Sequence, residues 1–337
     1  MRAHLLDNIE GQASVRNGTL VQGAECSAAW LTWHMKSTAR IAGVLCCAWC
    51  AKAAWSQELE PRSYSPAPVG LNFALAGLTR STGEVLTDPS VPISDVEAKL
   101  NAGVAGYGRT FGILGHQASV LIAAPYVWGD IAGNVFEEAR SVTRSGLGDM
   151  RLRLAANLIG GEALTPREFM KRTPKTTLGA SLSISAPTGQ YDPTKLINLG
   201  TNRWAFKPEI GLTIPHDRWM FDMFAGVWLF TDNDEFFGGV RRSQDPMPTL
   251  QWHVSYTIRP RAWVALDSTY YFGGETSANG VAADDRKENS RVGLTLSLPV
   301  GKSHSLKFNY SRGATARLGS NFTSYGVAWQ YSWFDKP

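Results

Sequence analysis

Residues 325–334 read Tyr-Gly-Val-Ala-Trp-Gln-Tyr-Ser-Trp-Phe, so large apolar side chains alternate with small or polar ones almost to the C-terminus. Side chains two residues apart lie on the same face of a β-strand. A strand with lipid on one face and water on the other requires this pattern. The stretch therefore predicts a membrane strand, and with it a chain that is mostly the wall of a β-barrel.

The composition favours a membrane barrel over several other classes. Charged residues form 18% of the 337 residues, whereas an average soluble domain has roughly 25%. The net charge of +4 is small and spread along the chain, so we expect no nucleic-acid partner. After residue 57 no apolar run reaches the roughly 18 residues that a spanning helix needs, which excludes a helical membrane protein.

The beginning of the chain has the pattern of a secretory signal peptide. Two cations, Lys36 and Arg40, precede an apolar run over residues 41–51, and small residues near Ser56 give a cleavage-site pattern. A lipoprotein signal is the alternative, because all four cysteines lie in the first 50 residues. We expect secretion and no cysteine chemistry in the rest of the chain.

These features divide the chain into four parts. We expect residues 1–34 to be a non-native or cleaved extension and residues 35–56 to be the signal peptide. Residues 57–68 then form a periplasmic N-terminal lead, and residues 69–334 form the barrel. A signal peptide also suits a soluble periplasmic sheet protein, so this alternative stays open.

Alternating segments continue throughout the predicted barrel. We expect strands near residues 69–79, 96–110, 117–127, 148–159, 175–186, 203–214, 218–230, 249–259, 261–272, 290–299, 304–312 and 322–334. About 12 strands is an even number, as in single-chain bacterial barrels. Alternation gives the two faces of each strand, but it does not say which face meets lipid.

The connections between these segments alternate in length. Tight turns are expected at residues 214–218, 259–261 and 299–303. Long polar loops are expected near residues 80–95, 128–147, 187–202, 231–248 and 273–289. This asymmetry is typical of outer-membrane barrels. The connection near residues 160–174 is the exception, since it is long on the short-turn side, and its sequence suits a brief amphipathic helix.

Tryptophans near the ends of the segments suggest two interfacial belts. Trp128, Trp204, Trp228 and Trp252 lie on the loop side, and Trp219, Trp263 and Trp333 on the turn side. Core tryptophans of a soluble β-sandwich are the alternative. Taken together, the patterns predict an all-β fold, a transmembrane up-and-down antiparallel β-barrel of the outer-membrane type, in a Gram-negative bacterium.

Polar side chains on the alternating segments are expected to line the lumen. The inward positions are Glu97, Lys99, Arg109, Arg151, Arg153, Lys207, Glu209, Asp222, His253, Asp267, Arg291 and Lys307. The solute-binding candidates among them are Arg151, Arg153, Lys207, Glu209, Asp222, Asp267, Arg291 and Lys307. Such charges either pair across strands or bind a polar group of a solute. Arg151 and Arg153 are the best solute candidates, because no acid lies beside them on their own strand and guanidinium suits carboxylate or phenolate.

The loop near residues 187–202 permits two interpretations. Its proline, glycine and aspartate residues favour a rigid outer loop. Alternatively, the loop folds inward as a constriction, with Gly189, Asn198, Asn202 and Arg203 as gating candidates. A nearby acidic group, residues 232–235, either holds a divalent cation or is solvated loop charge. We expect no metal site.

The sequence offers little support for catalysis. His253 shares a face with Ser255, but side chains two residues apart on a strand are too distant for direct proton transfer, and the face points into the lumen. No G-x-S-x-G motif is present. We expect neither an enzyme nor a cofactor.

Several motifs occur in the order found in a known family. They are Leu59–Arg62, Tyr64–Gly70, Asp88–Ile93, Ala124–Val127, Gly146–Met150, Pro187–Asp192 and Asn198–Trp204. Together they resemble outer-membrane proteins of the phenol-degradation meta-pathway (MetA-pathway) family, from near Leu59 to Trp333. The resemblance implies an outer-membrane barrel that takes up aromatic or hydrophobic compounds, with outer-membrane lipid, lipopolysaccharide and a small hydrophobic or aromatic solute as partners.

The function expected from these patterns is a passive outer-membrane channel for small aromatic or hydrophobic compounds. A barrel of about 12 strands lies between filled barrels of eight and open porins of 16–18, so any passage is narrow and gated. A non-transporting barrel that serves as a surface scaffold is the alternative. The C-terminal stretch looks like the signal read by the barrel-assembly machinery, through Tyr325, Trp329, Tyr331 and Trp333.

Overall fold

The computed structural model describes residues 59–86, 93–135 and 138–335. The expected extension over residues 1–34 and the signal peptide over residues 35–56 lie outside these ranges. Among the described residues, no helix is long and apolar enough to cross a membrane.

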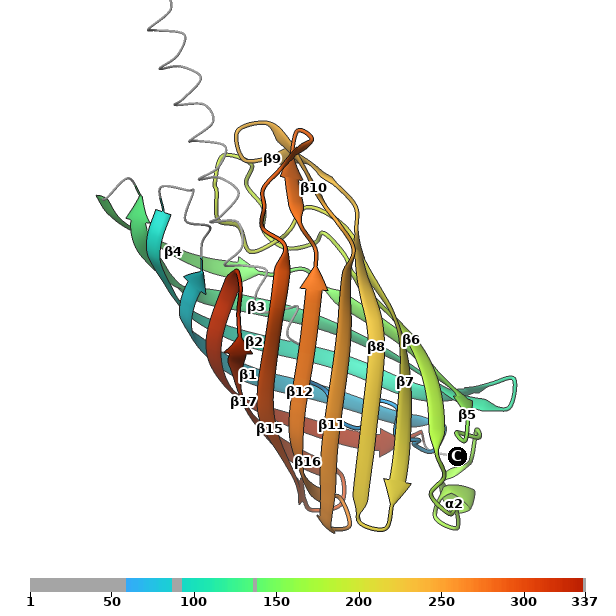
Figure 1. Ribbon diagram of the computed structural model, residues 1–337. Helices are drawn as coiled ribbons and strands as arrows, with labels where there is room; N and C mark the ends of the chain where they lie inside the picture. Colours follow the sequence, from blue (N-terminus) through green and yellow to red (C-terminus); the bar gives the residue numbers. More distant parts are fainter. Residues whose placement is uncertain (1–58, 87–92, 136–137, 336–337) are drawn as a thin grey trace, which may run out of the picture. The chain divides into compact units, whose positions relative to one another are not determined.

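One antiparallel sheet closes on itself to form a barrel (Figure 1). Its strands are β1 (Leu71–Leu86), β2 (Ile93–Ile113), β3 (His116–Val135), β4 (Glu138–Leu147), β5 (Arg151–Ile159), β6 (Thr177–Ser185), β7 (Ala205–His216), β8 (Trp219–Phe230), β11 (Met247–Arg259), β12 (Ala262–Gly273), β15 (Lys287–Val300), β16 (His304–Thr315) and β17 (Gly319–Phe334). Strand β1 pairs with both β2 and the C-terminal strand β17, and β3 pairs with β2. These pairings join the two ends of the chain in one wall.

Two of these strands act as one interrupted strand. Strand β4 pairs with residues 126–135 of β3, and β5 pairs with residues 118–123 of the same strand. Between them, the amide of Gly148 donates to the carbonyl of Pro125 at 3.0 Å. The wall therefore has twelve strands, which confirms the predicted fold class.

The two ends of the barrel differ in their connections, as the sequence predicts. Short turns join β2 to β3, β7 to β8, β11 to β12 and β15 to β16 at one end, the lower end in Figure 1. The longer connection at this end contains the short helix α2 (Pro166–Phe169). Thr165 and Glu168 cap it reciprocally, each side chain bonding the other residue's backbone amide. By the usual asymmetry, this end faces the periplasm.

Two of the long loops form a second, smaller sheet at the other end. It contains β9 (Asn233–Phe236), β10 (Val240–Gln244), β13 (Thr276–Ala278) and β14 (Val281–Ala282). Phe236, Val240 and Ala278 make its small apolar core. We call this sheet the cap; β9 and β10 are at the top of Figure 1.

Two predicted loops are in fact largely strand. The loop predictions near residues 80–95 and 128–147 are wrong for most of their length. Strand β1 continues to Leu86, and β3 continues to Val135. Strand β4 occupies much of the second predicted loop. Strand β2 has 21 residues, although about 9–11 are enough to cross a bilayer. We call residues 80–86, 93–101, 128–135 and 138–147 the outer extensions.

Exposure settles which face of the wall meets lipid. Leu78, Ile210 and Leu266 point outward and are 58%, 59% and 59% exposed. Asp222 and Arg291 point inward and are 1% and 2% exposed. A soluble barrel would bury its apolar face, so the exposed apolar face identifies this wall as membrane-spanning.

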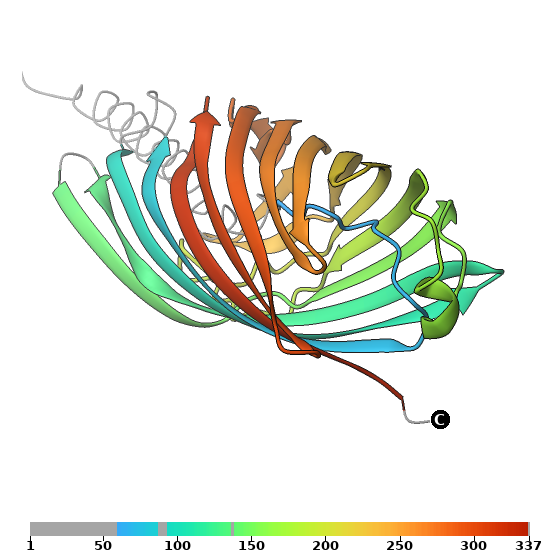
Figure 2. The same cartoon turned by 90° about the horizontal axis from the view of Figure 1, so that it is seen from below.

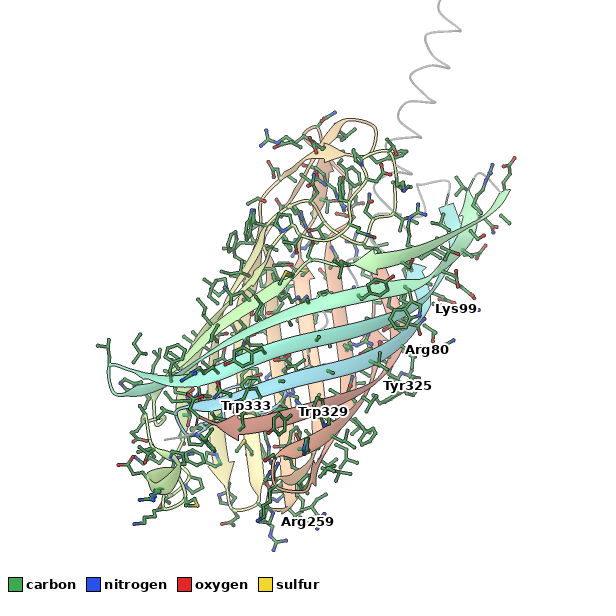
Figure 3. All side chains as sticks on the ribbon, turned by 180° about the vertical axis from the view of Figure 1, so that it is seen from behind. Arg80, Lys99, Arg259, Tyr325, Trp329 and Trp333 are labelled. Atoms are coloured by element: carbon green, nitrogen blue, oxygen red, sulfur yellow. The ribbon has the colours of Figure 1, made fainter. Side chains whose placement is uncertain are left out.

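Aromatic side chains mark the edges of the lipid-facing wall. Trp329, Tyr331 and Trp333 stack in a row on the outside of β17, with neighbouring ring centroids 6.4 and 5.2 Å apart (Figure 3). The predicted placement of Trp228 and Trp263 in the interfacial belts is wrong. They face inward, because each shares the parity of the inward residues on its own strand.

Candidate functional site

The segment before the first strand lies inside the barrel. Residues 59–70 run along the inner wall, and Figure 2 shows the segment in blue inside the ring of strands. Tyr64 is 1% exposed. Its hydroxyl lies 2.8 Å from the Ser181 hydroxyl and donates to a carboxylate oxygen of Glu209 at 3.0 Å. The sequence predicts a periplasmic lead that is separate from the barrel, whereas in the structure this segment enters the lumen.

Two glycines in the wall make room for the Tyr64 ring. A Cβ atom at Gly179 on β6 or at Gly211 on β7 would overlap with ring atoms of Tyr64. The ring also packs edge-to-face against Phe224, with centroids 5.0 Å apart. The wall is therefore shaped to receive this side chain.

Arg62 fixes the same segment to the neighbouring part of the wall. Its backbone amide donates to Asp222 at 3.1 Å. Its guanidinium donates to the hydroxyls of Ser255 and Thr257, both at 2.8 Å, and lies 4.8 Å from the ring centroid of Trp263. These contacts connect the segment to β8, β11 and β12.

All eight predicted solute-binding candidates face inward, but most are held by wall residues. Lys207 and Glu209 form an ion pair at 3.0 Å, and Gln251 donates to Glu209 at 3.0 Å. Arg153 lies 4.0 Å from the same carboxylate, which belongs to the second strand along the sheet. The sequence could not show this acid beside Arg153, because β5 itself carries none. Pairing between strands therefore describes this group better than an open binding site.

The other inward acids are bound in the same way. Asp222 accepts a hydrogen bond from Thr213 at 2.6 Å, and Asp267 accepts one from Thr295 at 2.6 Å. His253 Nδ1 lies 2.7 Å from the second oxygen of Asp267. These bonds satisfy the buried carboxylates, as buried charge requires.

The remaining inward cations contact aromatic rings or hydroxyls. Arg151 lies 5.8 Å from the ring centroid of Trp228, and Lys307 lies 5.9 Å from that of Trp263. Arg291 donates to Ser311 at 3.0 Å and to Ser324 at 2.9 Å. His253 also faces inward, as predicted.

Three predicted lumen residues are on the outside. On the outer face, Lys99 is in register with Thr82, and Glu97 is in register with Glu84. Both Lys99 and Glu97 are exposed. Arg109 also points outward and forms an ion pair with Asp335 at 2.6 Å. All three lie near strand ends, where the outer face meets water rather than lipid.

The loop over residues 187–202 folds into the upper end of the barrel. Asp149, at the break between β4 and β5, accepts from the backbone amides of Gly189 and Thr201, both at 2.9 Å. Asn198 stabilises the loop from within, since its side-chain carbonyl oxygen accepts a hydrogen bond from the backbone amide of Asp192 at 2.9 Å. Of the two sequence interpretations, the inward position matches the structure; the gating role of these residues remains a proposal.

The tip of this loop covers an apolar surface inside the outer extensions. Leu196 and Ile197 pack against a cluster of buried side chains, which we call the upper apolar cluster: Val85, Val96, Ala98, Leu100, Ile131 and Phe322. These residues come from β1, β2, β3 and β17. The upper interior is therefore apolar, whereas the interior at the level of the membrane is polar.

Arg203 lies under the cap beside the loop. It is 4% exposed, its guanidinium lies 4.3 Å from the ring centroid of Phe230, and it donates to Gln244. Burial, reinforced by the nearby Arg242, lowers the pKa of Arg203 to about 9. Asn202 donates to Asn233 of the cap at 3.1 Å. The two gating candidates at the end of the loop thus connect it to the cap.

Among the described residues, His253 and Ser255 bond other side chains and not each other. The Ser255 hydroxyl accepts from Arg62, and His253 Nε2 is buried with no hydrogen-bond partner among the described residues. No group of three or more histidine, cysteine, aspartate or glutamate side chains within residues 59–86, 93–135 and 138–335 could hold a metal ion.

The fold and the lipid-facing wall define an outer-membrane β-barrel with segments folded into its lumen. The chain belongs to the family described as "Putative MetA-pathway of phenol degradation", whose model matches residues 81–335. This match confirms the resemblance seen in the sequence.

Solved structures that resemble this chain include outer-membrane channels, porins and autotransporter translocator domains. The COG4313 outer membrane channel from Pseudomonas putida F1 is 21% identical, with a TM-score of 0.69 over 82% of this chain and 100% of that one. The TodX monoaromatic hydrocarbon channel is 12% identical, with a TM-score of 0.43 over 82% of this chain and 93% of that one. No curated protein sequence matches the chain.

Proposed function

We propose that this protein is a passive outer-membrane channel for the uptake of small aromatic or hydrophobic compounds. The upper apolar cluster carries the proposal, because it gives the inside of the barrel an apolar surface that is covered by a loop rather than by the wall. A solute that partitions out of water gains free energy on such a surface. Membership in the family and the channel fold are consistent with this function.

In this function the loop over residues 187–202 is the entry gate. Leu196 and Ile197 would leave the upper apolar cluster when a solute takes their place. Gly189 holds one end of the loop to Asp149, and Asn202 and Arg203 hold the other end to the cap. Asn198 stabilises the loop from within, so the four residues together set how easily it moves. Residues 59–70 would then form a second closure, held by Arg62 and Tyr64.

Processing and assembly complete the proposal. Cleavage after Ser56 would leave a short lead whose first described residue, Leu59, already lies in the lumen, since a Cβ at Gly293 on β15 would contact it. Outward aromatic residues of β17, Tyr325, Trp329, Tyr331 and Trp333, are available to the barrel-assembly machinery. The channel would need neither a cofactor nor a catalytic residue.

A non-transporting scaffold is the second candidate, and the anchored lumen favours it. Arg62 and Tyr64, the latter through Glu209 of the Lys207–Glu209 pair, join the N-terminal segment to the consecutive strands from β6 to β12. If these contacts never open, no solute passes through the lumen, and the barrel serves only to present its cap at the cell surface.

Uptake of a radiolabelled neutral aromatic compound into vesicles with a lipopolysaccharide outer leaflet tests the proposal. We expect wild-type protein to raise the uptake rate above that of empty vesicles. Ile197→Asp should raise it further, because a carboxylate cannot stay in the upper apolar cluster. Val281→Asp, at a cap residue that is 66% exposed, is the control and should match wild type. Uptake equal to that of empty vesicles for every variant would instead support the scaffold.

A further inference from the structure

Three cations lie together under the cap, at the upper end of the barrel. They are Arg203, which follows the loop over residues 187–202, Arg242 on β10 and Lys287 at the start of β15. Arg203 and Arg242 are 4% and 2% exposed. We call the three residues the cationic group. Burying a cation costs free energy unless hydrogen bonds and opposite charge replace the lost water, so the surroundings of the group decide what it can bind.

Hydrogen bonds through Gln244 connect two members of the cationic group. The side-chain oxygen of Gln244 accepts from Nη2 of Arg203, and its side-chain nitrogen donates to the carbonyl of Gly274 at 2.9 Å. The Lys287 ammonium group donates to the same carbonyl at 3.2 Å. Arg242 lies two residues before Gln244 on β10, so their side chains share a face of that strand. The three cations are therefore neighbours.

Repulsion acts between these neighbours. Burial lowers the pKa of Lys287 to about 8, and the positive charges of Arg242 and Arg203 add to this shift. The carboxylate of Asp285 opposes the shift, but both of its oxygens already accept hydrogen bonds from Thr276. Asp285 therefore offsets only part of the charge of the cationic group.

Two more acids act on Arg203, and both are bonded elsewhere. Asp232 forms an ion pair with the exposed Arg241. Asp149 accepts hydrogen bonds from backbone amides of the loop over residues 187–202 and its end. The cationic group thus keeps an excess of positive charge, which favours an anion as its partner.

One atom of the cationic group shows where an anion would bind. Nη1 of Arg203 is buried, and no described residue accepts a hydrogen bond from it. The rest of this guanidinium is occupied, since it donates to Gln244 and lies over the ring of Phe230. A buried charged N–H without an acceptor is costly. An acceptor oxygen at Nη1 would remove this cost.

Aromatic side chains form a surface directly below the cationic group. Trp228 and Tyr271 belong to one buried cluster, and Phe230 packs against it. The rings of Trp228 and Phe230 stack with centroids 6.4 Å apart. Tyr271 lies two residues nearer the membrane than Gly273, which is in register with Lys287. We call Trp228, Phe230 and Tyr271 the aromatic group. Charge above and aromatic rings below thus lie side by side.

We propose that the cationic group and the aromatic group form a binding site for an aromatic carboxylate. The carboxylate oxygens accept from Nη1 of Arg203 and from the neighbouring cations, because carboxylate and guanidinium match in geometry and charge. The ring of the acid lies against the aromatic group, where it leaves water and packs on other rings. This inference rests on the proposed function, since the acid reaches the site only when the loop over residues 187–202 moves. It makes aromatic acids a second class of solute beside neutral compounds.

Isothermal titration calorimetry of sodium benzoate into the full barrel in phospholipid nanodiscs tests the site. Arg203→Gln should bind benzoate at least about tenfold more weakly than wild type, because it removes a charged donor. Lys287→Gln is a second variant with an expected loss in the same direction. Arg286→Gln removes an exposed charge beside Lys287 and should bind as wild type does. All variants should keep the heat-modifiable band shift of a folded barrel. The titrations are repeated with Ile197→Asp added, so that a closed loop cannot hide the site.

Three other ligands test the chemistry of the site. Benzamide has the ring without the charge, acetate has the charge without the ring, and inorganic phosphate is an anion with no apolar part. Each should bind wild type at least about tenfold more weakly than benzoate.

Three results would overturn the inference. They are no benzoate binding even with Ile197→Asp, binding by Arg203→Gln and Lys287→Gln that equals that of wild type, and binding of any of the three other ligands as tight as that of benzoate. Uptake of a neutral aromatic compound is measured separately. If that uptake persists alongside one of these results, the anion site fails and the channel function stands.

Discussion

The membrane-embedded wall and the outer extensions use the same alternation in opposite senses. In the wall, Leu266 and Leu294 point outward, and Asp222 and Arg291 point inward. In the outer extensions, polar residues such as Glu84 and Lys99 point outward, and the upper apolar cluster points inward. Both regions belong to the same continuous strands, and β1, β2 and β3 each pass from one region to the other.

The difference follows from the medium on the outside. Lipid makes an apolar outer face favourable, and the enclosed polar groups then satisfy each other, as Lys207 and Glu209 do. Above the lipid the outside is water, so apolar side chains gain by turning inward. There they meet one another and a loop, through Leu196 and Ile197. The apolar interior needed for a hydrophobic solute exists because the strands are longer than the bilayer is thick.

The largest loss in the free energy of unfolding is expected when one of the charges enclosed by the wall is removed. Glu209→Ala removes the carboxylate 3.0 Å from the buried Lys207 ammonium. We expect a loss of about 3–5 kcal/mol in the free energy of unfolding, as for other broken buried pairs. Glu84→Ala on the outside of the extensions should cost less than about 0.5 kcal/mol. Urea unfolding in lipid vesicles measures both, and equal small losses would show that the wall does not enclose its charges.

A cation on the outer face should distinguish the two regions by position alone. Leu266→Arg puts a guanidinium into the lipid and should cost about 2–4 kcal/mol near the bilayer midplane. Ala132→Arg, on the exposed outer face of the extension of β3, should be close to neutral. The comparison fails if Ala132→Arg is as harmful as Leu266→Arg under the same unfolding conditions.

A smaller effect is expected from a single methyl group inside the extensions. Ile131→Val leaves a gap in the upper apolar cluster and should cost about 0.5–1.5 kcal/mol. Ile122→Val on the lipid-facing side of the same strand should cost less, because acyl chains fill the space. A larger loss at Ile122 than at Ile131 would mean that the cluster is not packed.

The smallest effect is expected from protonation of one carboxylate in the loop over residues 187–202, which enters the upper end of the barrel. Hydrogen bonds from Thr194, together with Lys195, lower the pKa of the exposed Asp192 to about 2. Its contribution to the loop is therefore complete above the ordinary pKa of 3.8 and is lost as the pH falls through about 2. A carbon-13 NMR titration of the Asp192 carboxyl group should have its midpoint near pH 2. A midpoint near 3.8 would show that the loop does not hold this conformation.

Much of the fold could be predicted because alternation depends only on the two faces of a strand. All twelve wall strands, the short turns and the eight inward solute-binding candidates follow from parity and turn residues. The same rule misplaced Glu97 and Lys99, since a polar residue faces inward only where lipid lies outside. It also placed Trp228 and Trp263 in interfacial belts, although both rings face the lumen and contact cations there.

The contents of the lumen were harder to predict. Residues 59–70 have no alternation, so nothing local reveals that they lie against the inner wall. The available signal is the pair of inward glycines, Gly179 and Gly211, which leave space between neighbouring strands for Tyr64. Arg153 shows the same limit, because its acidic neighbour Glu209 belongs to a distant part of the sequence.

Spin labels at two outward positions of β1 test whether its outer face passes from lipid to water. Single-cysteine variants at Leu78 and Glu84 place both labels on one face of one strand, in lipid vesicles containing the folded barrel. We expect relaxation at position 78 to respond to dissolved oxygen, which partitions into lipid, and relaxation at position 84 to respond to a water-soluble nickel complex. The same response at both positions would contradict an outer face that passes from lipid to water along the strand.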